Sequence, residues 1–257
     1  LDYGKIINTR YVVLATGNPS PEWPCKINKS FLSLNHKFSS RLIQNPWVLK
    51  NFNKIDKLEN ISLLGSGLTS LDILLALYSR GHRGCINVFS KSGEFPPVQA
   101  NWKKEKSPKW PGINNRFKAS DFINFIKSYL PDHPTSSNKW QSAWEELRDV
   151  ISFNWLRLSQ KDMLLLKKHF GSFWSRLRYR ASPQTIDAVN NLIKSNQLRI
   201  HKARVTEIGL KNNKLFVFCS NLTKHESDII INCSGVGKDK LISKLIQQIK
   251  KNYGISL

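Results

Sequence analysis

The feature that most constrains the fold is a glycine-rich turn between an apolar strand and a helix. Asn60–Leu64 is a short apolar segment, Gly65–Ser70 (GSGLTS) follows it, and Leu71–Tyr78 has helical periodicity. A second apolar segment, Cys85–Phe89, comes after this helix. Strand, glycine turn, helix and strand within about 30 residues is the arrangement of a mononucleotide-binding βαβ unit. We therefore predict an α/β fold that contains a Rossmann-like NAD(P)-binding unit.

The three small residues of this turn match the positions that a dinucleotide requires. Gly65 permits the tight reversal, Gly67 lets the pyrophosphate approach the backbone, and Ser70 is small enough for the helix to pack on the strand. The phosphates then lie at the positive helix end, near the amide of Leu68 and the hydroxyls of Thr69 and Ser70. These five residues are the predicted cofactor-binding turn. The alternative is a glycine-bearing turn that holds no ligand.

The end of the second strand indicates which dinucleotide is preferred. Ser90 and Lys91 stand there, about 25 residues after Gly65, where an NAD-binding protein has an acidic residue. A hydroxyl and a cation favour the 2′-phosphate of NADP. We predict NADP, or else NAD, as the cofactor, with Ser90 and Lys91 among its ligands.

The rest of the chain predicts a helical insertion followed by strands. Helical periodicity and the N-cap candidates Ser120, Ser159 and Ser182, the last followed by Pro183, predict helices within 112–197. From residue 198 the apolar period changes to two. The predicted strands are Leu198–Ala203, Val205–Leu210, Leu215–Cys219 and Asp228–Asn232, with a hairpin turn at Lys211–Lys214 and a final helix at Lys240–Lys251.

Two distant segments share a strand-to-turn pattern. Val12–Gly17 (VVLATG) and Asp228–Gly235 (DIIINCSG) are each an apolar strand that ends in a small residue, a hydroxyl residue and glycine. Taken singly, each pattern is typical of any strand that leaves a sheet. Their places on either side of the Gly65–Ser70 unit make the pair more informative.

With these motifs the chain resembles the bacterial FAD/NAD(P)-binding oxidoreductase-like proteins, which are flavoproteins with two dinucleotide-binding domains. The family motif, a strand, GxGLTxxD, a helix and a GHRG link, is similar to Gly65–Asp72 and Gly81–Gly84. The following serine, basic residue and glycine are similar to Ser90–Gly93. An aromatic and arginine-rich stretch before a helix looks like Phe173–Pro183, although Leu177 and Tyr179 stand where the family has histidines. The resemblance covers most of residues 8 to 240.

The resemblance implies an FAD domain interrupted by an NAD(P) domain, with hydride transfer from NADPH to flavin and an unknown small-molecule substrate. It places Thr16, Gly17, Ser234 and Gly235 at the cofactors. The family's own FAD fingerprint would precede Leu1 and its closing segment would follow residue 257, so we expect a portion of a longer enzyme that binds FAD only when completed. The expected division is 1–24 partial FAD-type domain, 25–58 linker, 59–111 NAD(P)-binding-like βαβ unit, 112–197 helical insertion and 198–257 return strands with the terminal helix.

The charge leaves three interpretations open. Lys and Arg number 40 against 18 Asp and Glu, a net charge of +22 over 257 residues. A solvated basic surface is favoured over binding of a phosphate-bearing cofactor, and both over nucleic-acid binding. The nucleic-acid alternative depends on Asn101–Lys118, where six basic residues alternate with Trp102, Trp110 and Phe117. The alternatives to an oxidoreductase are therefore a basic interaction protein that binds nucleic acid on a catalytically dead Rossmann scaffold, and a non-functional gene fragment.

Other functional classes have little support in the sequence. The four cysteines form no CxxC pair and the six histidines show no ligand spacing, so no metal site is predicted. No apolar run is long enough to span a membrane, and we expect a reduced, cytoplasmic protein. No catalytic residue can be assigned. Arg83, Arg178 and Arg180 are candidates for binding a phosphate or an anionic substrate, with an exposed basic surface as the alternative.

Overall fold

The structure is a computed structural model of the chain, and it describes most but not all of its residues. The described residues are 9–11, 13, 18–28, 36–48, 52–101, 118–130, 139–212, 214–237, 244, 247–249 and 251–252. Thr16, Gly17 and the residues 102–117 of the basic segment lie outside them. So does about half of the expected terminal helix Lys240–Lys251.

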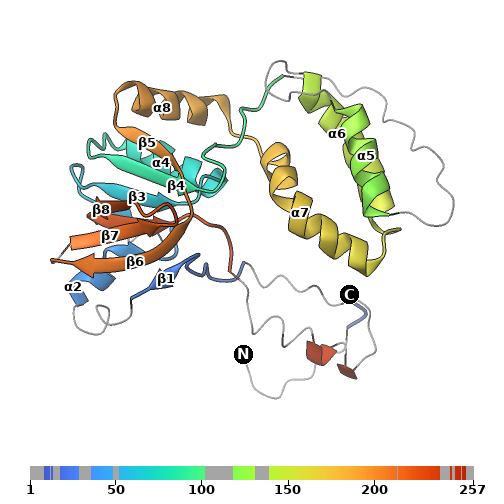
Figure 1. Cartoon of the computed structure of the whole chain (residues 1–257), viewed down its shortest axis with the longest axis horizontal. Helices are drawn as coiled ribbons and strands as arrows, with labels where there is room; N and C mark the ends of the chain where they lie inside the picture. The colour runs from blue at the N-terminus through green and yellow to red at the C-terminus, as the bar shows by residue number, and fades with distance from the viewer. Residues whose placement is uncertain are drawn as a thin grey trace.

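The centre of the fold is a parallel sheet of five strands (Figure 1). Its order is β2-β9-β3-β4-β5, and every neighbouring pair is parallel. The strands are β2 (Leu42–Ile43), β9 (Ile229–Asn232), β3 (Ile61–Leu64), β4 (Ile86–Ser90) and β5 (Leu198–Lys202). This sheet, with helices on one face, confirms the predicted α/β class and the Rossmann-like unit.

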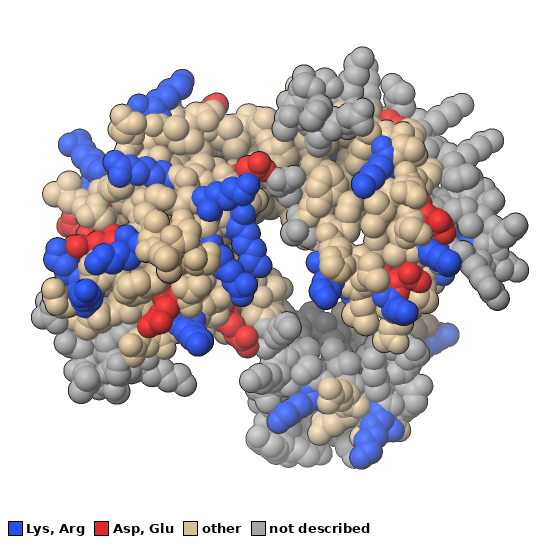
Figure 2. Space-filling view, in the orientation of Figure 1, with Lys and Arg blue, Asp and Glu red and all other residues tan. Residues whose placement is uncertain are grey.

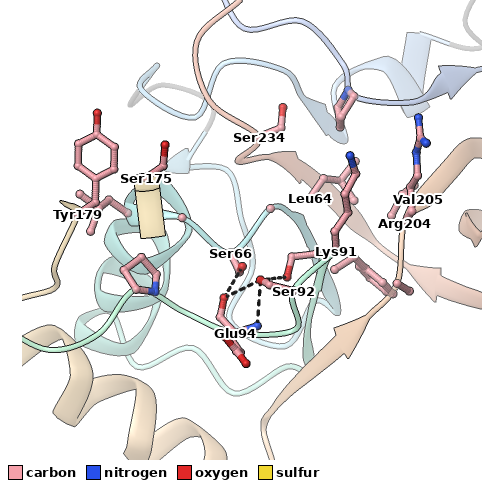
Figure 3. A pocket seen from close by; sticks show the side chains of 18 of the residues that line it. Leu64, Ser66, Lys91, Ser92, Glu94, Ser175, Tyr179, Arg204, Val205 and Ser234 are labelled. Atoms are coloured by element: carbon pink, nitrogen blue, oxygen red, sulfur yellow. Dashed lines mark hydrogen bonds between the residues drawn. The ribbon is translucent and has the colours of Figure 1, made fainter. Parts of the chain in front are cut away.

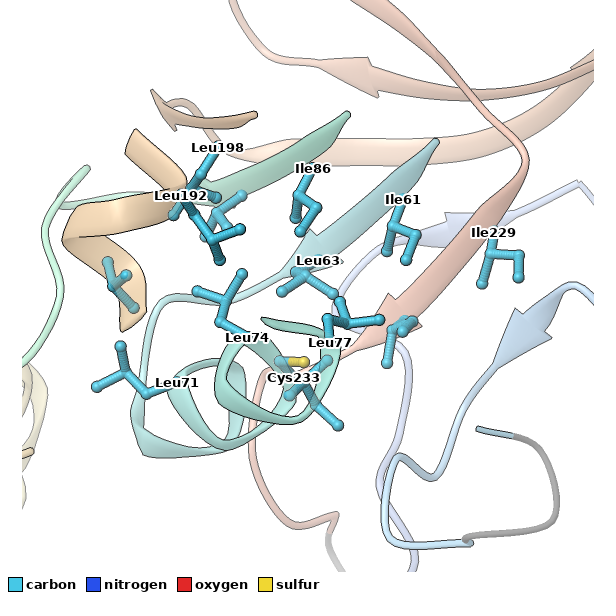
Figure 4. Packing of buried hydrophobic residues seen from close by; sticks show 14 of the residues in the cluster. Ile61, Leu63, Leu71, Leu74, Leu77, Ile86, Leu192, Leu198, Ile229 and Cys233 are labelled. Atoms are coloured by element: carbon cyan, nitrogen blue, oxygen red, sulfur yellow. The ribbon is translucent and has the colours of Figure 1, made fainter. Parts of the chain in front are cut away.

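One face of this sheet is covered by two helices. Helix α4 (Leu68–Ser79) connects β3 to β4, and α8 (Pro183–Lys194) packs beside α4 before the chain enters β5. Leu63 of β3, Ile86 of β4 and Leu74 of α4 are fully buried where the helices meet the sheet. Leu192 of α8 belongs to the same cluster (Figure 4). The apolar runs in β3 and β9 follow from this position, since a central parallel strand is buried on both faces.

A second, mostly antiparallel sheet covers the opposite face. It has the order β1-β6-β7-β8, formed by β1 (Lys26–Ile27), β6 (Val205–Lys211), β7 (Lys214–Cys219) and β8 (Lys224–Ser227). Leu64, Phe89 and Ile230 of the parallel sheet pack against Ile208 and Val217 of this one. The predicted hairpin is confirmed, because Lys211 pairs with Lys214 across the β6–β7 turn. Helix α2 (His36–Ser39) lies between β1 and β2 in the chain.

Three further helices form a group with a core of its own, apart from the two sheets in Figure 1. They are α5 (Ala119–Tyr129), α6 (Lys139–Trp155) and α7 (Gln160–Arg178). Ser159 caps α7 by accepting the amide of Asp162, and Ser182 caps α8 by accepting that of Thr185, as predicted. The Ser120 cap is wrong, because α5 already begins at Ala119 after Lys118.

Two contacts concern the expected division of the chain, which stays a prediction. Helix α8 falls within 112–197 but packs on the sheet against α4, so only α5 to α7 stand apart as an insertion. Strands β5 and β9, expected in a separate FAD-type domain, complete the same sheet as β3 and β4. The sequence period identifies these strands, but strand order depends on long-range pairing that the period does not encode.

Charges of both signs are mixed on one face of the described part of the molecule (Figure 2). On the face seen in Figure 2, Lys and Arg are spread over both parts of the molecule and Asp and Glu lie among them. Among the described residues, no helix combines the length and the apolar character needed to cross a bilayer.

Candidate functional site

The predicted cofactor residues gather at the carboxyl ends of the parallel strands. A cavity of about 850 Å³ opens there, between the ends of β3, β4 and β5 on one side and α7 on the other (Figure 3). Ligands of open α/β sheets bind at this edge. The residues that line it are Pro24, Leu64–Leu68, Phe89–Ser92, Glu94, Pro96, Lys167, Lys168, Phe173, Ser175, Tyr179, Ala203–Val205 and Ser234.

Gly65 is required by the protein itself. Its φ is +116°, a conformation that side chains rarely adopt, and a Cβ there would stand 2.5 Å from the carbonyl oxygen of Cys233. Its amide donates to the carbonyl of Phe89 at 2.8 Å. Glycine at this position therefore allows the tight turn that follows β3, where β4 and the end of β9 lie on either side.

Gly67 is different, because the protein does not need a glycine there. Its φ is −77°, and an added Cβ would meet nothing within 4 Å. It is the N-cap of α4 with no side-chain cap, and the amides of Leu68 and Thr69 have no hydrogen-bond partner among the described residues. Helix amides that point into open space form an anion site. The residues present thus fit a pyrophosphate.

Ser70 has a packing role rather than a ligand-binding one. It is completely buried between α4 and the sheet, and its Oγ has no hydrogen-bond partner. The requirement for a small residue at this position is consistent with the close packing. Burial does not favour the predicted donation of this hydroxyl to a phosphate, which stays a prediction. Thr69 stands in the first turn of α4 but does not line the cavity.

Two cations stand at the strand ends. Lys91 follows β4 and Arg204 follows β5, and their side chains extend in the same direction along the cavity (Figure 3). The Oγ of Ser90 accepts the amide of Gly93 at 3.0 Å, which fixes the turn that carries Lys91. The one acidic residue in the lining is Glu94, whose carbonyl accepts the hydroxyl of Ser66 at 2.6 Å. Cations therefore outnumber acids around the cavity.

The structure brings some predicted site residues together and leaves others out. Gly65, Gly67, Leu68, Ser90, Lys91 and Ser234 all line the cavity. Gly235 does not, although its neighbour Ser234 is held there by two hydrogen bonds to the Oδ1 of Asn232. Thr16 and Gly17 lie outside the described residues.

Sequence reasoning missed Arg204 and the residues of α7. Arg204 comes directly after a predicted strand, and side chains at the carboxyl ends of parallel strands share one edge, so its position was an available signal. Lys167, Lys168 and Tyr179 gave no such signal, because they reach the cavity only through the placement of α7.

The arginine candidates have other positions. Arg83 lies in the exposed link before β4, at the end of the sheet opposite to the cavity. The Arg180 side chain is 4% exposed, bonds Glu145 at 3.1 Å and lies over the Trp140 ring, so it is a structural ion pair. Burial lowers its pKa, partly offset by Glu145. Arg178 is exposed and lines a second cavity.

Two histidines lie behind the cavity wall. The ring of His201 stacks on that of Phe89, with 4.7 Å between the ring centroids. The ring of His225 contacts both, with centroid distances of 4.9 Å to Phe89 and 4.4 Å to His201. Nε2 of His201 bonds Oδ1 of Asn87 at 2.8 Å. Burial lowers the pKa of both histidines, and the charge of His225 lowers that of His201 further. Within the described part of the chain no three His, Cys, Asp or Glu side chains form a metal-binding group.

No protein-family model and no curated protein matches the chain. Solved structures similar to it include an ornithine hydroxylase from Pseudomonas aeruginosa, with 11% identity, a TM-score of 0.46 and coverage of 87% of this chain and 45% of that one. An L-lysine 6-monooxygenase from Pseudomonas syringae has 16% identity, a TM-score of 0.42 and coverage of 90% and 47%. A lysine monooxygenase from Nocardia farcinica has 18% identity, a TM-score of 0.37 and coverage of 84% and 43%. The chain thus spans less than half the length of these proteins, and at such scores its function has to be argued from its own residues.

Proposed function

We propose that this chain is the dinucleotide-binding portion of an FAD- and NAD(P)H-dependent oxidoreductase, and that it binds NADPH in the cavity at Gly65–Leu68. The observation that carries the proposal is the open space beside Gly67. Neither the φ of Gly67 nor its neighbours require a glycine, and within the described part of the chain the helix amides beside it are free. The missing side chain therefore leaves room for a pyrophosphate to contact the backbone.

The cations at the strand ends support NADPH over NADH. Lys91 stands where an acidic residue would bind the ribose of NAD, and Arg204 extends beside it from the next strand. A 2′-phosphate between an ammonium and a guanidinium gains charge-assisted hydrogen bonds, which are roughly twice as strong as neutral ones. NADH offers only a hydroxyl at that place.

The flavin part of the proposal comes from the sequence resemblance. When bound together, the two cofactors supply the hydride donor and acceptor, while the protein supplies position and electrostatics. The described residues contain one strand–glycine turn–helix unit, at Gly65, and thus fit one dinucleotide. The flavin contacts of Thr16, Gly17, Ser234 and Gly235 stay predictions, and the substrate is a small molecule of unknown class. The nucleic-acid alternative depends on the basic segment 102–117, which lies outside the described residues.

The proposal is tested by titrating the chain with NADPH and NADH while thermal unfolding is followed. NADPH at about one hundred times its dissociation constant stabilises the folded state by about 2.7 kcal/mol, which raises the melting temperature by roughly 5 to 10 °C. NADH gives a smaller shift at the same concentration. Gly67→Val removes both shifts, because its side chain occupies the phosphate space while the protein can accommodate it.

Lys91→Gln tests the choice between the two nucleotides. It should reduce NADPH binding about tenfold and leave NADH binding unchanged, since only NADPH has the 2′-phosphate. Lys211→Gln is the matched control, an exposed lysine at the far end of β6. The proposal fails if neither nucleotide shifts the melting temperature, or if Gly67→Val binds NADPH as well as the parent chain does.

A further inference from the structure

A second cavity lies inside the group of helices α5, α6 and α7, apart from the glycine turn. Its volume is about 570 Å³. It opens to solvent, and its volume is within the roughly 300 to 1,000 Å³ of ligand pockets. Its lining is Phe122, Ile151, Ser152, Trp155, Leu166, Lys167, Phe170, Gly171, Trp174, Ser175 and Arg178.

The walls of this cavity are aromatic and apolar. Phe122, Ile151 and Leu166 are buried, and Trp155 and Trp174 are half-buried. Aromatic rings offer a large apolar contact surface, so these walls suit a ligand with an apolar body.

The polar residues of the lining carry positive charge. Lys167 and Arg178 are exposed on α7, three turns apart, with the hydroxyls of Ser152 and Ser175 as the other polar groups. Among the described residues that form the lining, none is acidic. An apolar interior beside two cations is complementary to a ligand with an apolar body and one anionic group.

Gly171 keeps the cavity open. It lies in the middle of α7, where glycine costs about 1 kcal/mol relative to alanine. A Cβ at this position would meet nothing within 4 Å, so the surrounding residues do not require a glycine. A larger side chain would extend into the cavity.

We propose that this cavity binds an apolar carboxylate, with an aromatic or medium-length acyl body among the tryptophans and the carboxylate at Arg178 and Ser175, which lie one turn apart on α7. Arg178 offers a planar pair of donors that matches a carboxylate. Lys167 and Ser175 also line the first cavity, so the two cavities are neighbours. This binding does not depend on the proposed function.

The test is calorimetric titration of the whole chain with decanoate, below its micelle concentration, and with 1-naphthoate. Both should bind, and decyltrimethylammonium, which has the same chain and the opposite charge, should bind at least about tenfold more weakly. Arg178→Gln should weaken decanoate binding about tenfold, and Lys167→Gln, three turns away on α7, should weaken it less. Lys161→Gln, an exposed lysine of α7 outside the lining, is the matched control and should not.

Gly171 supplies a second, steric test. Gly171→Leu should abolish decanoate binding, while Gly171→Ala should keep most of it and unfold at the same or a higher temperature. The proposal is overturned if neither carboxylate binds, if decyltrimethylammonium binds as well as decanoate, or if a folded Gly171→Leu variant binds decanoate normally. Should Gly171→Leu not fold, the two charge variants decide. NADPH binding measured in the same samples separates this result from that for the dinucleotide site.

Discussion

Two glycines of one turn should respond to alanine in opposite ways. At Gly65 the φ of +116° costs a side chain roughly 1 to 3 kcal/mol. The contact of 2.5 Å between the new Cβ and the carbonyl of Cys233 adds roughly 1 to 3 kcal/mol, because backbone must move. The reduced freedom of the unfolded chain returns about 0.4 to 1 kcal/mol. Gly65→Ala should therefore lower the free energy of unfolding by about 2 to 5 kcal/mol.

Gly67→Ala should be nearly neutral for stability. Its φ of −77° suits alanine and the Cβ meets nothing. Alanine is a poorer N-cap than glycine by roughly 0.5 to 1 kcal/mol, and the gain from the unfolded chain offsets this. The free energy of unfolding should stay within about 0.5 kcal/mol of the parent, while NADPH binding weakens because the Cβ enters the phosphate space.

Urea unfolding followed by circular dichroism measures both effects. Tryptophan fluorescence would mix signals from different parts of the chain, since four of its eight tryptophans, Trp140, Trp144, Trp155 and Trp174, lie on α6 and α7. With an m-value of about 3 kcal/mol per M, Gly65→Ala moves the midpoint down by roughly 1 M. The reasoning is refuted if both variants lose the same stability. The fold would then require both glycines or neither, and Gly65 could not be assigned to the fold and Gly67 to the ligand.

Three further substitutions test the remaining assignments. Ser70→Ala should raise the free energy of unfolding by about 1 kcal/mol and leave NADPH binding unchanged, as urea unfolding and titration would show, because the buried Oγ has no partner. Burial holds the pKa of His201 and His225 below the ordinary 6.5, so the unfolded chain binds more protons. Stability should be constant above about pH 7.5 and fall as pH drops through 6.5 toward the folded-state values, and His201→Gln should flatten this urea-unfolding profile. Arg180→Gln should cost roughly 3 kcal/mol, because it removes one partner of a buried ion pair with a carboxylate of α6, whereas the exposed Arg178→Gln should unfold like the parent.

The glycine turn could be predicted from sequence because its constraints are local. A left-handed backbone at Gly65, a small residue at Ser70 and apolar strands on both sides depend on residues close to one another in the chain. The same holds for the Ser159 and Ser182 caps, where a hydroxyl bonds an amide three residues later. These features needed no knowledge of the rest of the fold.

The position of β9 and the contribution of α7 could not be predicted in this way. Ile229–Asn232 is completely apolar up to its last residue, and such a run indicates a central strand without naming its neighbours. Its place between β2 and β3 depends on pairing across more than 160 residues. Likewise, Lys167 follows an ordinary helical period, and only the position of α7 across the cavity from the strand ends brings it to the cavity lining.

Lys167 and Ser175 link the two proposed sites, since they line both cavities. A dinucleotide phosphate and a carboxylate bound at the same time in these neighbouring cavities would repel each other, so each lowers the affinity for the other. Binding linkage requires this effect to be reciprocal and equal in free energy. The carboxylate therefore lowers the affinity for NADPH by the factor by which NADPH lowers the affinity for the carboxylate.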